Sequence, residues 1–125
     1  MNAVAYKTID AIIEDLGSGF FSILVDESRD ISIKEQMTVV LRYVDKKGIV
    51  TKWFLGIIHV ADTSAFSLKA AIKFLFCKYA LSLSGLRGQG YNGTNNMQGE
   101  FSGLKTLILK ENKSAFYVHY FAHQL

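Results

Sequence analysis

Alternating and continuous hydrophobic stretches dominate the first half of the chain. Phe20 to Val25 is a short apolar run followed by Asp26-Glu27-Ser28, and such a run between turn signals predicts a strand buried on both faces. Residues 36–44 alternate between apolar and polar, and residues 50–60 predict the strand that pairs with them. Asp45-Lys46-Lys47-Gly48 predicts the hairpin loop between them, with Gly48 at positive φ. The pattern therefore predicts three consecutive strands.

Helical spacing of apolar residues marks three other segments. Residues 3–16 predict a leading helix that ends at Gly17-Ser18-Gly19. Asp62-Thr63-Ser64 is a cluster of N-cap residues, and an amphipathic pattern over residues 65–79 follows it. A third helix is predicted where apolar residues recur at Met97, Phe101, Leu104 and Ile108.

Two shorter strands complete the pattern, one around residues 84–91 and one over residues 115–121. The resulting order predicts an α/β fold, in which a mixed sheet of about five strands carries helices packed on it. We expect a leading helix and Gly-rich link over residues 1–18 and a core over residues 19–125.

Composition narrows the class of protein. Half of the 125 residues are hydrophobic, which excludes disorder as the main state. The longest charge-free apolar run, Trp53 to Ala61, is far shorter than the roughly 20 residues of a membrane helix, and residues 1–7 resemble no secretory signal. Cys77 is the single cysteine; we expect it to be packed rather than nucleophilic, in a nuclear or cytoplasmic protein that is neither membrane-bound nor secreted.

Three groups of residues could carry chemistry, and each has a simpler interpretation. Asp26 at the mouth of a central strand could hold a divalent cation, or it could only cap a turn. Gly88, Gly90 and Gly93 match G-x-G-x-x-G, so a loop over Gly88–Gly93 could bind a nucleotide, or could be a tight turn. His119 and His123 have no third ligand near them in sequence, which favours capping over a zinc site.

Several ordered segments together resemble one known family. They include Val25-Asp26-Glu27-Ser28, the run from Arg87 through Gly93 to Met97, and the run from His119 to Leu125. These segments resemble the catalytic core of hAT-superfamily transposases, in the transposon-derived group of zinc-finger MYM-type and TTF-type proteins, often treated as a domain of unknown function. The resemblance covers residues 20–125 and implies a ribonuclease H-like fold, with the fourth strand beside the first and Asp26 beside Asn92.

The resemblance also implies an activity, which is metal-dependent cleavage and joining of DNA strands. Two divalent ions, Mg²⁺ or Mn²⁺, would be held by acidic residues, and Asp26 matches the first catalytic aspartate. Asn92, however, stands at the position of the second aspartate, and Tyr120 stands at the cysteine of a C-x-x-H pattern that His123 completes. The family's third acidic residue lies downstream of Leu125. We therefore expect a fragment truncated at its C-terminus, with a degenerate active site that holds no metal firmly and is inactive.

The sequence is compatible with three functions. The first is an inactive transposase-derived fragment. The second is a domesticated module that binds DNA, a protein partner or another copy of itself through Lys and Arg on the open side of the sheet. Arg87 and His123 are its candidate nucleic-acid contacts, and the net charge of +3 is compatible with DNA. The third is a nucleotide-binding protein that uses the Gly88–Gly93 loop.

Overall fold

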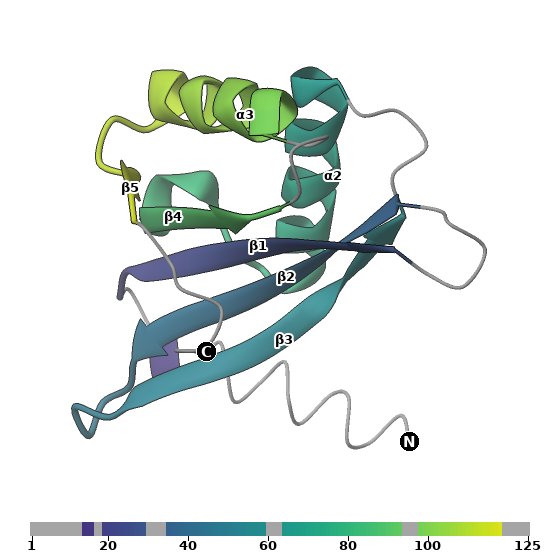
Figure 1. Ribbon diagram of the computed structural model, residues 1–125. Coiled ribbons are helices and arrows are strands. Elements are labelled where there is room, and N and C mark those ends of the chain that lie inside the picture. Colours follow the sequence, from purple (N-terminus) through teal and green to yellow (C-terminus); the bar gives the residue numbers. More distant parts are fainter. Residues whose placement is uncertain (1–13, 17–18, 30–34, 60–63, 94–97, 119–125) are drawn as a thin grey trace.

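The described residues of the computed structural model form one sheet covered on one face by helices (Figure 1). These residues are 14–16, 19–29, 35–59, 64–93 and 98–118. The elements in chain order are β1 (Phe21–Arg29), β2 (Glu35–Val44), β3 (Val50–His59), α2 (Ala65–Lys78), the 3₁₀ turn η1 (Leu83–Gly85), β4 (Leu86–Asn92), α3 (Gln98–Glu111) and β5 (Phe116–Tyr117).

The five strands described lie in the order β3-β2-β1-β4-β5. β2 is antiparallel to both β1 and β3, whereas β4 is parallel to β1 and to β5. The connection from β3 to β4 runs through α2, and the connection from β4 to its parallel neighbour β5 runs through α3, as parallel neighbours need. The predicted α/β fold with a mixed sheet is confirmed.

The hydrophobic core lies between the sheet and the two helices. The predicted alternation in β2 is confirmed, because every second side chain is buried in this core. Burial of each large apolar side chain contributes about 1.5–3 kcal/mol. The helical contribution comes from Leu68, Ile72, Leu75 and Phe76 of α2 and from Phe101, Leu104 and Ile108 of α3.

Local signals set the hairpin and the start of α2 as predicted. Gly48 has φ +81°, and one carboxylate oxygen of Asp45 accepts the backbone N–H groups of Lys47 and Ile49, each at 2.9 Å. Ser64 is the N-cap of α2, and its side chain accepts the N–H of Ser67. No helix in the described ranges has the length and apolarity to cross a bilayer.

Two predictions were wrong. Asp26-Glu27-Ser28 is not a turn, because β1 continues to Arg29 and pairs with β2 along its whole length. Cys77 is exposed rather than packed, since the side of α2 that carries Leu68 and Ile72 faces the core and Cys77 lies outside that side. Residues 14–16 are helical, and the rest of the predicted leading helix lies outside the described residues.

Candidate functional site

Asp26 and Asn92 are direct neighbours across the parallel pair of β1 and β4. Asn92 is the last residue of β4, so the pair lies where that central strand ends. Val25 and Tyr91, which precede them and are also paired, contact the core beneath the helices. Side chains alternate along a strand, so those of Asp26 and Asn92 project from the opposite side of the sheet.

The electrostatic environment of Asp26 disfavours its charged form. Partial burial, together with the nearby charge of Glu27, raises the pKa of the Asp26 carboxyl above its ordinary value. Glu27 follows Asp26 along β1 and is buried on the helical side, next to Gly93. The two carboxyl groups therefore repel each other from opposite faces of the sheet and do not form one ligand set.

The donor set at this position does not fit the two divalent ions of the family chemistry. Such a centre needs several carboxylates to neutralise its cations. The pair offers one carboxylate, whose pKa is raised, and one neutral amide oxygen. The described part of the chain holds no group of three or more His, Cys, Asp or Glu side chains that could hold a metal ion.

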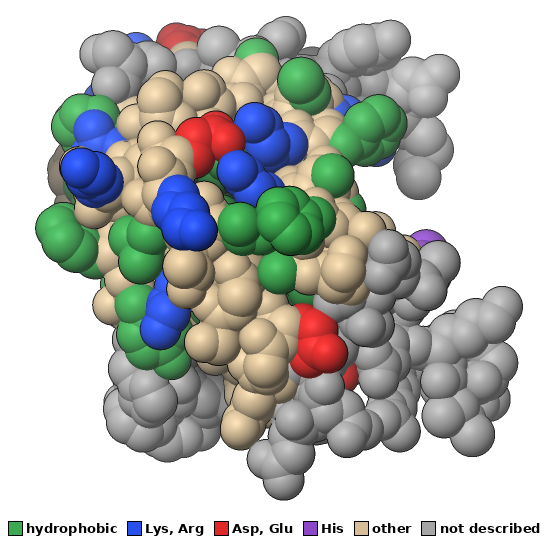
Figure 2. All heavy atoms as spheres, turned by 90° about the horizontal axis from the view of Figure 1, so that it is seen from above, with side chains coloured by type: hydrophobic (Ala, Val, Ile, Leu, Met, Phe, Trp, Pro, Cys, Tyr) green, Lys and Arg blue, Asp and Glu red, His purple; other side chains and the backbone are tan. Residues whose placement is uncertain are grey.

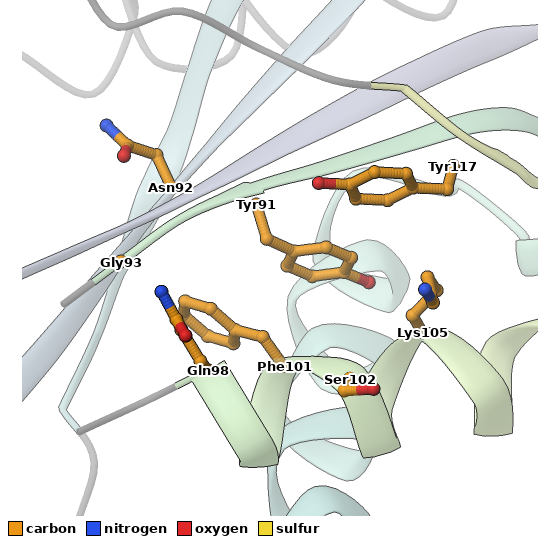
Figure 3. Close-up of a pocket in the computed structure, with 8 residues that line it drawn as sticks. All are labelled: Tyr91, Asn92, Gly93, Gln98, Phe101, Ser102, Lys105 and Tyr117. Atoms are coloured by element: carbon orange, nitrogen blue, oxygen red, sulfur yellow. The ribbon is translucent and has the colours of Figure 1, made fainter. Parts of the chain in front are cut away.

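A cavity of about 440 Å³ lies next to Asn92, between the sheet and the first half of α3 (Figure 3). The rings of Tyr91 and Phe101 form part of its wall, with centroids 5.2 Å apart and planes inclined by 30°. Across the cavity, the Lys105 ammonium lies 4.8 Å from the centroid of the Tyr117 ring. The lining residues are Tyr91, Asn92, Gly93, Gln98, Phe101, Ser102, Lys105 and Tyr117.

A buried hydrogen-bond network holds the Tyr91 ring in place. The Tyr91 hydroxyl donates to Oε1 of Gln89, a side chain with no exposed surface. Nε2 of Gln89 donates to the carbonyl oxygen of Ala115 at 2.9 Å, which ties β4 to the segment before β5. Burial, and then the nearby Tyr117, raise the pKa of Tyr91, so the hydroxyl stays protonated and remains a donor.

Arg87, a predicted nucleic-acid contact, lies at the other end of β4. Asn92 lies five positions further along the strand, which corresponds to roughly 16 Å. Its Nη1 donates to the carbonyl oxygens of Ser84 (2.8 Å) and Leu86 (3.0 Å), and its guanidinium lies 3.8 Å from the centroid of the Phe20 ring. The structure therefore does not bring Arg87 to the Asp26–Asn92 pair. His123 lies outside the described residues.

Most of the Gly88–Gly93 segment, which could have formed a nucleotide-binding loop, belongs to a strand, as the strand expected around residues 84–91 implies. Gly88 and Gly90 lie inside β4, and only Gly93 follows it. A Cβ on Gly88 would lie 2.9 Å from Cβ of Ser22 on β1, so glycine at this position serves close strand packing rather than phosphate binding.

Comparison with known proteins identifies the family. Residues 1–103 match the family described as the ZMYM1/FAM200 RNase-like domain. The chain belongs to this family. This confirms the resemblance to transposase-derived ribonuclease-like domains, and the mixed sheet fits a partial ribonuclease H-like fold. The match includes Asp26, Asn92 and most of the cavity wall.

One curated relative is the "52 kDa repressor of the inhibitor of the protein kinase" of Homo sapiens. It is 27% identical to this chain over 101 residues, which is 80% of this chain. The aligned region is 13% of the human protein, so this chain spans only a small part of its length.

Proposed function

We propose that this ribonuclease-like domain binds nucleic acid without cleaving it. The observation that carries the proposal is the pairing of Asp26 with Asn92 at the end of β4, the place where the family chemistry would need two carboxylates. One carboxylate and one amide supply a single negative charge against the four positive charges of two divalent ions. The human relative is named a repressor, a role that requires no strand cleavage.

The distribution of charge supports binding to a polyanion. Residues 64–118 contain seven of the 14 basic residues of the chain but only two of the 11 acidic ones. Figure 2 shows the helical face of the molecule, where basic and hydrophobic side chains share the surface and acidic side chains are few. Lysines arranged in this way attract phosphate groups and make binding strongly dependent on salt. Most of this positive charge lies on the helices, whereas the expectation from sequence was the open side of the sheet.

Restoring the missing carboxylate tests the loss of metal chemistry. We expect the natural chain to show no Mg²⁺- or Mn²⁺-dependent cleavage of labelled DNA. Asn92→Asp should raise the Mn²⁺ affinity, measured by calorimetry, by about tenfold or more, because it adds a second anionic ligand beside Asp26. The double variant Asp26→Asn/Asn92→Asp is the matched control and should lose this gain. Metal-dependent cleavage by the natural chain that Asp26→Ala abolishes would contradict the proposal.

Binding itself is tested by the dependence of DNA affinity on salt. We expect the logarithm of the affinity to fall linearly with the logarithm of the salt concentration, as it does when lysines release counterions from phosphates. Absence of measurable binding to both single-stranded and duplex DNA at about 50 mM salt would overturn this part of the proposal.

A further inference from the structure

The cavity beside Asn92 has walls suited to a flat ring. Tyr117 of β5, which is 45% exposed, presents a ring to it, and Tyr91 of β4 and Phe101 of α3, which pack on each other, form the rest of its aromatic lining (Figure 3). Stacking of a nucleic-acid base on such a ring strengthens binding by roughly 5- to 160-fold.

These walls are fixed before any ligand arrives. The hydroxyl of Tyr91 donates a hydrogen bond to the side chain of the buried Gln89, and this bond sets the position of the ring. Gly93 leaves the space that Phe101 occupies, because a Cβ on Gly93 would lie only 2.5 Å from the Phe101 ring. A preformed wall of this kind reduces the entropy lost when a ligand binds.

The polar groups of the cavity favour an anionic ligand. The ammonium of Lys105 lies next to the Tyr117 ring, and the side chains of Gln98 and Ser102 supply donors and acceptors. No Asp or Glu is among the described residues that line the cavity. A ligand with a planar ring, hydrogen-bonding edges and a negative group fits this combination.

The geometry points to an unpaired nucleotide of a nucleic-acid strand as the ligand of this cavity. Its base would lie against the aromatic walls and its phosphate beside Lys105. A volume of about 440 Å³ falls within the size range of small-ligand pockets and suits one nucleotide rather than a folded peptide. The inference rests on the proposed function in assuming that this domain binds nucleic acid, and it adds that an unpaired base is recognised at this cavity.

Fluorescence anisotropy of the 125-residue chain with a labelled 12-nucleotide single strand tests the inference. Tyr117→Ser should weaken binding roughly 5- to 160-fold, the range expected from loss of one stacked base. Lys105→Gln should also weaken it and should reduce the salt slope by about one. Phe66→Ser, at an aromatic residue on α2 that is 74% exposed, and Lys110→Gln, at an exposed position on α3, are matched controls expected to change the affinity less than about twofold.

Competition and duplex measurements separate the possible results. A fully paired duplex should bind with the same affinity to the natural chain and to Tyr117→Ser, because its bases stay stacked. Equal effects of Tyr117→Ser and Phe66→Ser on the single strand, with circular dichroism showing that both variants are folded, would overturn the inference and leave the proposed function intact. Tighter binding of free thymidine monophosphate than of the oligonucleotide, lost in Tyr117→Ser, would overturn it in favour of a free nucleotide. Failure of the natural chain to bind any nucleic acid would overturn the proposed function itself.

Discussion

Gln89 is a polar side chain with no exposed surface, in the middle of β4. It accepts a hydrogen bond from Tyr91 and donates one to Ala115, so a single amide connects the cavity wall, its own strand and the entry to β5. Buried polar groups are stable only when such bonds are complete. Gln89 therefore fixes the position of the cavity wall through directional hydrogen bonds, which an apolar residue could not make.

Gln89→Leu should lower the free energy of unfolding by about 1–3 kcal/mol, because it leaves the Tyr91 hydroxyl and the Ala115 carbonyl without these partners. Urea denaturation followed by circular dichroism measures this loss. Gln98→Leu, at an exposed position on α3, is the control and should change stability by no more than about 0.5 kcal/mol. Equal denaturation midpoints for the two variants would contradict the role given to Gln89.

Asp26 gives the stability of the domain a dependence on pH. Its pKa is raised in the folded state, first by burial and then by Glu27, so the folded state holds this proton more tightly than the unfolded state does. The contribution of Asp26 is therefore fully present below the ordinary pKa of 3.8 and is lost as the pH rises through the raised value.

Asp26→Asn should consequently raise the urea midpoint at pH 7, because the amide resembles the protonated carboxyl. At pH 3 the same substitution should have little effect, since Asp26 is then protonated in both states. The comparison of the two pH values in one variant is its own control. A gain of the same size at pH 3 and pH 7 would show that the substitution acts through something other than ionisation.

At the scale of elements, α2 and α3 approach each other closely at Gly103. A Cβ on Gly103 would lie 3.0 Å from Cβ of Ala65 on α2. Elsewhere on the two helices, Oε1 of Glu111 on α3 forms ion pairs with Nζ of Lys69 (2.8 Å) and Nζ of Lys73 (3.2 Å) on α2. A small residue at one point and surface ion pairs at another thus join the two helices over the sheet.

Two glycines of the same helix offer a matched test of this contact. Gly103→Val should destabilise the domain by about 1–3 kcal/mol, because the added atoms force α3 away from Ala65. Gly99→Ala meets nothing within 4 Å, so it should leave stability unchanged or raise it by about 0.5 kcal/mol through helix propensity. Thermal unfolding measures both; destabilisation of similar size in the two variants would show that the loss does not come from the contact with Ala65.

The whole molecule has two unlike sides. The helical side carries the five lysines of α2 and α3 and the aromatic cavity. On the other side of the sheet, Phe54 is 58% exposed and Ile57 is 48% exposed, both on β3, an edge strand among those described. Apolar side chains on an exposed sheet edge promote association with another chain.

Phe54→Lys combined with Ile57→Lys should reduce concentration-dependent self-association, measured by sedimentation velocity, because charges at a sheet edge oppose pairing. Phe74→Lys is the control: this residue is 80% exposed on α2, and its replacement should leave the association unchanged. A natural chain that sediments as a monomer at all concentrations would contradict the prediction.

The sequence by itself determined the elements whose signals are local. The alternation in β2, the loop at Gly48 and the N-cap at Ser64 depend on residues near one another in the chain, and the structure confirms each of them. Such elements are predictable because backbone propensity and hydrophobic period act over a few residues. The neighbouring positions of Asp26 and Asn92 were predicted only through the family fold, because no local pattern links residues so distant in sequence.

Tertiary structure alone decided the rest. β1 extends past Asp26 because β2 supplies hydrogen-bonding partners as far as Arg29, and Cys77 is exposed because core packing sets the rotation of α2. The cavity combines Tyr91, Phe101 and Tyr117 from three elements that only the crossover connections bring together. Its residues share no spacing that a sequence pattern could reveal, because the distances between them arise from packing and not from position along the chain.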